Sequence, residues 1–300
     1  MLKFNCIMLL IKVGKGMIQN KIKDNINELS KKDMIVLIEK LKNKQEMQEK
    51  FILDIYHDLR SPLNVIMSVN QMLESIKKNN ELYNTKETEY LKMLRRNSYK
   101  MLKLIDNLMD VTKLEKNHFE IKKKNIEIVR FIEGTIESID KYAKQKNLTL
   151  IFDTNKEECI VAIDPEALDR ICINLISNAI KFSESENFIY ITLMIDNKLV
   201  KISFMDNGIG ISKEDQKNIF NRFNQVNTNG EYKGSGIGLD LVKSLVELHG
   251  GSVSLESKLG YGSNFIITLP NEKIEAEEIK FEEERNKVQL LEIEFSDIYL

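Results

Sequence analysis

One histidine lies in a helical pattern with polar neighbours that could take part in chemistry. Residues 51–66 read FILDIYHDLRSPLNVI, in which His57 is followed by Asp58 and, one helical turn later, by Ser61. The surrounding apolar residues recur in steps of three and four, which predicts a helix packed on other helices. With Ile52 at heptad position a, His57 falls at position f, on the outward face that also carries Ser61. A lone surface histidine more often has no chemical task, so this stretch alone assigns no function.

A second polar group follows one face of a predicted helix over residues 169–183. Arg170, Asn174, Asn178 and Lys181 are spaced by four, four and three residues, and therefore share that face. Such a stripe is often a solvated helix face. Two amides and a lysine could instead hold a divalent ion and phosphate oxygens, because magnesium prefers hard oxygen ligands.

Two glycine-rich stretches suggest close approach to a ligand. DNGIG, residues 206–210, places a carboxylate and then glycines after the apolar stretch LVKISFM, although a simple turn would explain this pattern as well. GSGIGL, residues 234–239, opens a predicted helix whose N-terminus could bind phosphate. The segment before it is a polar loop and the chain has no G-x-x-x-x-G-K-[ST], which excludes Rossmann and Walker sites.

The elements that must position these groups fall into two parts. Helices are predicted over residues 33–78, with a bend at Pro62, and 88–115, joined by the polar loop KKNNELYNTKE. One such hairpin cannot enclose its own apolar seam, so two hairpins are expected to form a dimeric four-helix bundle.

An α/β domain is predicted from about residue 125 to 270. Short β-like runs alternate there with helical stretches: LTLIF, CIVAID, FIYITLMI, LVKISFM, SVSLES and NFIITLP. The last thirty residues begin acidic, as a solvated tail does, and end in LLEIEFSDIYL, which is consistent with an added strand or a docking segment. The fold class is therefore α+β and multidomain, with a helical bundle followed by an α/β sandwich that has a mixed sheet.

Composition restricts the partners and the compartment. The 300 residues are 42% hydrophobic and 30% charged, with a net charge of −2, so no global basic field recruits nucleic acid or anionic lipid. Three cysteines without a C-x-x-C favour a reducing, cytoplasmic location. The apolar run at residues 6–11 is too short to span a bilayer, so any membrane association is expected through a partner.

Together these motifs resemble the sensor histidine kinases of two-component systems over residues 49–270. FILDIYHDLRSPLN resembles the phosphoacceptor box, NLISNAIKFS the asparagine box, DNGIG and GSGIGL the glycine boxes, IFNRF the phenylalanine box and GYGSNF the final glycine turn. The resemblance implies an N-terminal segment with a signalling helix (1–48), a dimerisation and phosphotransfer domain (49–118), a catalytic ATP-binding domain (119–270) and an acidic tail (271–300).

The resemblance also implies catalytic roles in the first domain. His57 would accept the γ-phosphoryl group of ATP as a neutral imidazole, and Asp58, where the family more often has glutamate, would accept the other ring N–H. Ser61 stands where the family usually has threonine or asparagine and keeps a hydroxyl that could position water for dephosphorylating the partner.

In the second domain, the resemblance implies that Asn178 holds Mg²⁺ and that Asp206 accepts from the adenine amino group. Phe220 and Phe223 would anchor the lid over the nucleotide. The other expected ATP-site residues are Asn174, Lys181, Phe182, Gly208, Gly210, Gly234, Gly236, Gly238, Leu239 and Ser263.

The expected function is autophosphorylation of a homodimer on a histidine and transfer to the receiver domain of a separate response regulator, with regulator phosphatase activity as a further expectation. Two other classes stay open at this point. One is a bare ATPase of the gyrase or mismatch-repair kind, and the other is a coiled-coil interaction protein that retains the domain. The phosphoacceptor box argues against the first, and the intact glycine boxes argue against the second.

Overall fold

The computed structural model describes residues 31–79, 83–115, 119–221, 236–275 and 286–297. The chain divides into two compact units, residues 1–57 and 58–300. In the first unit, all the described residues belong to one helix. Among the helices of the described ranges, none is long and apolar enough to cross a membrane.

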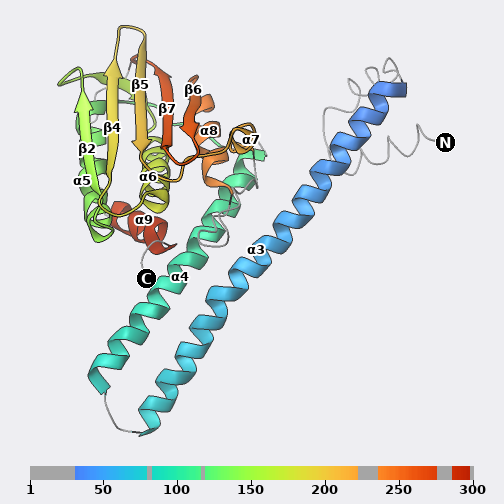
Figure 1. Cartoon of the computed structure of the whole chain (residues 1–300), viewed down its shortest axis with the longest axis vertical. Helices are drawn as coiled ribbons and strands as arrows, with labels where there is room; N and C mark the ends of the chain where they lie inside the picture. The colour runs from blue at the N-terminus through green and yellow to red at the C-terminus, as the bar shows by residue number, and fades with distance from the viewer. Residues whose placement is uncertain (1–30, 80–82, 116–118, 222–235, 276–285, 298–300) are drawn as a thin grey trace. The chain divides into compact units, whose positions relative to one another are not determined.

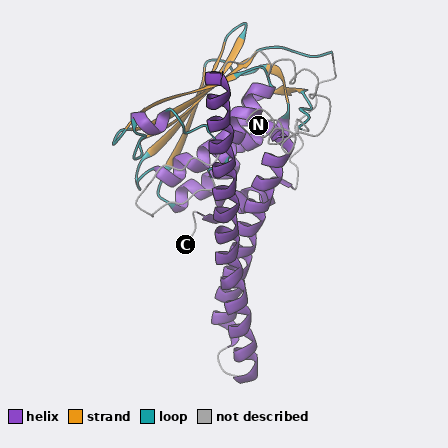
Figure 2. Cartoon of the chain, turned by 90° about the vertical axis from the view of Figure 1, so that its right-hand side faces the viewer, coloured by secondary structure: helices purple, strands orange, loops and turns teal. Residues whose placement is uncertain are grey.

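Two long helices confirm the helical part of the prediction. Helix α3 spans Lys31–Asn79 and α4 spans Tyr83–Glu115. Helix α3 continues through Pro62, as the predicted range 33–78 requires, because proline removes only one hydrogen bond and long apolar flanks can keep the helix intact. Helix α4 begins five residues earlier than expected, since residues 83–87 contain no glycine or proline that would stop it. Within the second unit, residues 58–79 of α3 run beside α4 (Figures 1 and 2).

Helix α3 carries an apolar seam and a separate exposed apolar face. On the predicted seam, Val69 is only 2% exposed and Ile66 is half-buried. Leu63 and Met67, one turn apart on the second face, are 43% and 55% exposed. The seam is therefore covered within this chain, whereas the second face is not.

The α/β domain is built on a five-stranded mixed sheet in the order β2-β4-β5-β7-β6 (Figure 1). Strands β2 and β4 pair in parallel and the other neighbours are antiparallel. A separate antiparallel pair joins β1 to β3. The strands are β1 Lys124–Glu127, β2 Thr149–Thr154, β3 Ile160–Ile163, β4 Phe188–Ile195, β5 Leu199–Asp206, β6 Ser252–Lys258 and β7 Gly262–Pro270. Strand β1 was not predicted, because its four residues follow a lysine run without strand-like periodicity.

Helices cover one face of this sheet. Burial alternates along β4 and β5, which is the pattern of strands with one face against a core. The core-facing helices are α5 Ile128–Gln145, α6 Pro165–Phe182 and α8 Gly238–Leu248, and a short α7 spans Lys213–Gln216. The mixed-sheet sandwich predicted from the sequence is confirmed.

The last described residues, 286–297, are helical. Helix α9 spans Asn286–Glu294 and a 3-10 helix, η1, spans Phe295–Asp297. Leu291 and Phe295 are buried in the main hydrophobic core. Residues 290–297 of LLEIEFSDIYL therefore belong to a docked helical segment and not to an added strand.

Candidate functional site

Helix α6 is fixed firmly at its beginning, which sets the position of its polar stripe. The Asp164 side chain caps the helix by accepting from the backbone N–H groups of Glu166 and Ala167 at 3.0 and 3.2 Å, and Pro165 occupies the first turn. The stripe residues Asn174 and Asn178 follow on this helix, and both side chains are half-buried.

A buried carboxylate ends strand β5. Asp206 is 6% exposed, and its Oδ1 accepts from the backbone N–H groups of Gly208 at 2.8 Å and Ser263 at 3.3 Å. Burial raises the pKa of this carboxyl, while the two backbone hydrogen bonds act in the opposite direction. Both bonds use Oδ1, so Oδ2 receives no hydrogen bond from the described part of the chain. Asp206 therefore presents an acceptor that is already oriented.

Two glycines bring the motifs together. A Cβ on Gly208 would lie 2.3 Å from the carbonyl oxygen of Phe182, at the end of α6. A Cβ on Gly238, at the start of α8, would lie 2.2 Å from Oδ1 of Asn174. The approach at Gly208 requires glycine, because its neighbour is backbone, whereas at Gly238 any side chain would displace the Asn174 amide. The asparagine-bearing helix, the DNGIG loop and the start of α8 therefore meet at one place.

The structure describes most, but not all, of the remaining expected ATP-site residues. Phe220 packs edge-on against Phe265 of β7, with ring centroids 6.2 Å apart. Ser263 pairs with Asp206 across β5 and β7. Phe223 and Gly234 lie outside the described residues. The ammonium of Lys181 lies 5.4 Å from the Phe182 ring centroid. Gly210 and Gly236 have a positive φ, and Leu239 is half-buried.

These residues fit a purine nucleotide. The Asp206 Oδ2 acceptor suits an exocyclic amino group, and the close glycine approaches leave backbone surface that no side chain covers. The amides of Asn174 and Asn178 offer hard oxygen ligands of the kind that Mg²⁺ prefers.

The expected phosphoacceptor residues all lie on α3. The backbone of His57 is helical, and its side chain is outside the described part of the structure. Asp58 is partly exposed, and Ser61 is exposed, as its outward heptad position predicts.

Sequence reasoning missed one contact of the stripe. Arg170 forms an ion pair with Asp110 of α4, whose side chain is 6% exposed. Burial lowers the pKa of Arg170, but the hydrogen bond and charge of Asp110 outweigh it, so that this pKa is raised overall. The spacing placed Arg170 on the correct helix face, but no sequence signal connects it to a residue sixty positions earlier.

His249 has a structural role. It is 3% exposed, its Nε2 accepts from the backbone N–H of Asp164 at 3.1 Å, and its Nδ1 lies 2.7 Å from the carbonyl oxygen of Leu245. These contacts require a neutral ring with the proton on Nδ1. Burial, with a smaller contribution from Lys123, lowers the pKa of His249.

Two family models match the chain and together cover more than half of it. Residues 47–117 match the His Kinase A (phospho-acceptor) domain, and residues 163–273 match the histidine kinase-, DNA gyrase B- and HSP90-like ATPase family. Histidine kinase P4 of Formosa agariphila is 34% identical over 78% of this chain and 17% of its own length. The chain thus spans less than a fifth of that relative.

Solved histidine kinases share the fold. Full-length ShkA in complex with AMPPNP aligns with a TM-score of 0.57 at 23% identity, over 76% of this chain and 47% of that one. Histidine kinase ThkA in complex with the response regulator TrrA aligns with a TM-score of 0.55 at 18% identity, over 82% and 68%. The matched phosphoacceptor and ATPase models, in the order that the motifs predict, show that the chain belongs to the two-component sensor histidine kinases.

Proposed function

We propose that this protein uses ATP to phosphorylate itself on His57 and then passes the phosphoryl group to an aspartate of a separate response regulator. The observation that carries the proposal is the buried Asp206, whose Oδ1 is held by two backbone N–H groups while its Oδ2 has no donor among the described residues. Such an acceptor favours adenine, which presents an amino group, over guanine, which presents a carbonyl.

The α/β domain supplies nucleotide binding in this proposal. Asp206 accepts from the adenine amino group, while Asn178, with Asn174 beside it, holds Mg²⁺. When bound, the ion neutralises phosphate charge. Lys181 adds positive charge near the phosphates, and Phe220 anchors the segment that follows α7 to the sheet. The complex of ShkA with AMPPNP supports a nucleotide at this domain.

The chemical step belongs to His57 on α3. A ring nitrogen of the neutral imidazole attacks the γ-phosphorus, and the bond from that phosphorus to the departing ADP oxygen breaks as the N–P bond forms. Asp58 accepts from the other ring N–H and stabilises the positive charge that develops on the ring. Positioning and charge neutralisation account for most of the rate enhancement in such transfers.

Transfer to a regulator uses the same outward helix face. The complex of ThkA with TrrA supports a response regulator as the partner. Ser61 is exposed one turn after His57, so its hydroxyl could position water against an aspartyl phosphate. We therefore include regulator phosphatase activity in the proposal.

A homodimer completes the proposed enzyme. Leu63 and Met67 of α3 and Ile105 and Leu108 of α4 are all more than a third exposed. An apolar face of this extent along two helices is typical of an interface between copies. A second hairpin of the same chain would cover it as a four-helix bundle.

Incubation with γ-labelled ATP tests the function, because phosphohistidine is labile in acid and phosphoserine is not. The chain contains only three histidines, at positions 57, 118 and 249. The wild type and His118→Gln should incorporate acid-labile phosphate, whereas His57→Gln should incorporate none and still bind nucleotide. Acid-labile phosphate on purified His57→Gln would overturn the assignment.

A further inference from the structure

The C-terminal segment 286–297, here called the clasp, contacts both α4 and the α/β domain. Helix α9 touches α4 and α6, and η1 also touches α4. The clasp therefore joins the second hairpin helix to the helix that carries Asn174 and Asn178.

The inner side of the clasp is fixed to the α/β domain by apolar packing. Phe295 is fully buried, and its ring stacks on Tyr142 of α5 with centroids 4.4 Å apart and an interplanar angle of 9°. Leu291, 2% exposed, belongs to the same core. These contacts are typical of a permanent part of a domain and not of a solvated tail.

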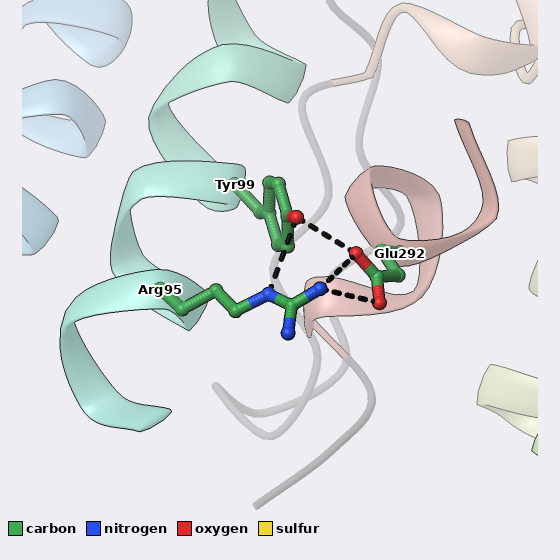
Figure 3. Close-up of polar contacts among 3 residues, drawn as sticks. All are labelled: Arg95, Tyr99 and Glu292. Atoms are coloured by element: carbon green, nitrogen blue, oxygen red, sulfur yellow. Dashed lines mark hydrogen bonds and ion pairs between the residues drawn. The ribbon is translucent and has the colours of Figure 1, made fainter. Parts of the chain in front are cut away.

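The outer side is polar and faces a basic and aromatic stripe on α4. Nη2 of Arg95 donates to both carboxylate oxygens of Glu292, at 2.7 and 2.6 Å, and the Tyr99 hydroxyl donates to the same carboxylate at 2.7 Å (Figure 3). Nζ of Lys103 donates to the carbonyl oxygen of Glu294 at 2.8 Å. Arg95, Tyr99 and Lys103 are spaced by four residues and so share one face of α4.

One carboxylate connects the two sides. Oε1 of Glu294 lies 3.3 Å from Nζ of Lys103 on α4 and accepts from the Ser177 hydroxyl of α6 at 2.9 Å. Ser177 directly precedes Asn178 in the proposed ATP site. The clasp thus reaches the back of the nucleotide-binding helix without occupying its polar stripe.

The two sides differ in how readily they can separate. The Arg95 and Glu292 side chains are 62% and 28% exposed, and exposed ion pairs contribute little to stability. Phe295 has no exposed surface. The Arg95–Glu292 contact should therefore open more readily than the packing of Phe295 on the α/β domain.

We propose that the clasp is an autoinhibitory contact, which holds the α/β domain on α4 through Glu292 and Glu294 and must open for catalysis. This inference rests on the proposed autophosphorylation. A histidine that receives a phosphoryl group from one domain and passes it to another protein must be approached by each in turn. A domain tied to one place on α4 cannot provide both arrangements.

Charge reversal in the full-length protein tests the clasp. Glu292→Arg should raise the initial rate of autophosphorylation at saturating ATP by about 3- to 10-fold, the effect expected for one charge-assisted contact. Nucleotide affinity should stay the same, since the ATP site is untouched. The exchanged pair Arg95→Glu with Glu292→Arg should restore the low rate.

A matched control lies on the α/β domain. Arg130 and Glu158 form an ion pair of 3.3 Å, with both side chains 71% exposed, so Glu158→Arg changes charge equally without touching α4. A rate for Glu292→Arg no higher than for this control, or an exchanged pair that stays fast, would overturn the proposal.

Small-angle scattering separates the clasp from the proposed function. The radius of gyration should be larger for Glu292→Arg than for the wild type and Glu158→Arg, because the α/β domain gains freedom. If the wild type formed no acid-labile phosphate, the proposed function would fail. Scattering alone would then decide on the clasp, and equal radii would refute it.

Discussion

Replacing Asp206 with asparagine should remove nucleotide binding without unfolding the domain. In Asp206→Asn, Oδ1 can still accept from the backbone N–H groups of Gly208 and Ser263, so the local fold keeps both hydrogen bonds. The Oδ2 acceptor becomes an NH₂ donor, which would face the adenine amino group. An unpaired buried polar group costs about 1–3 kcal/mol, so the affinity for ATP should fall roughly 5- to 150-fold.

The thermal stability of Asp206→Asn should not fall together with its affinity for ATP. Burial raises the pKa of Asp206 above its unfolded value, so its contribution to stability is complete below the unfolded pKa and is lost as pH rises through the folded pKa. Ionising this carboxyl is therefore less favourable in the folded state than in the unfolded chain. Asp206→Asn should unfold at the same temperature as the wild type at this pH, or at a higher one.

Fluorescent-nucleotide titration and thermal unfolding measure the two effects. The control is Asp196→Asn, because Oδ1 of Asp196 also accepts from two backbone N–H groups, those of Lys198 and Leu199, at 2.7 and 2.8 Å. This control should leave ATP affinity unchanged. Wild-type affinity in Asp206→Asn, or its loss together with a large drop in melting temperature, would refute the role given to Oδ2.

Three further predictions concern other parts of the chain. The pKa of His249 is lowered by burial, so its contribution to stability is complete above the unfolded pKa and is lost as pH falls toward the folded pKa. Below about pH 6.5 the free energy of unfolding should therefore decrease less steeply with falling pH in His249→Gln than in the wild type. The slopes should differ by at most about 1.4 kcal/mol per pH unit. Ser61→Ala should keep autophosphorylation within a few-fold and slow regulator dephosphorylation roughly tenfold, whereas equal dephosphorylation rates would leave Ser61 as a plain surface residue. Leu63→Glu with Met67→Glu should turn a dimer into a monomer in light scattering, and a monomeric wild type would contradict the proposed interface.

Local periodicity predicted most of the fold. The strand patterns around FIYITLMI and LVKISFM correspond to β4 and β5, because alternation marks a sheet with one covered face. Periodicity failed at the beginning of α4, where the polar residues 83–87 already belong to the helix. It also failed at β1, a short strand that depends on its pairing with β3.

The candidate site could be predicted only as far as its motifs extend. Asp206 and Gly208 belong to one stretch, and the structure brings them to the end of α6. The ion pair of Arg170 with Asp110 and the contact of Arg95 with Glu292 join residues far apart in sequence. Such contacts depend on how folded elements pack, and no spacing rule in a single sequence encodes them.

Phosphopeptide mapping at neutral to alkaline pH tests the central claim most directly. Cleavage after lysine and arginine releases residues 51–60, FILDIYHDLR, a peptide with one histidine, one tyrosine and no serine or threonine. After incubation with ATP, this peptide should carry a phosphoryl group that acid removes, which identifies His57. Phosphate that resists acid on this peptide, or acid-labile phosphate only on peptides containing His118 or His249, would contradict the account.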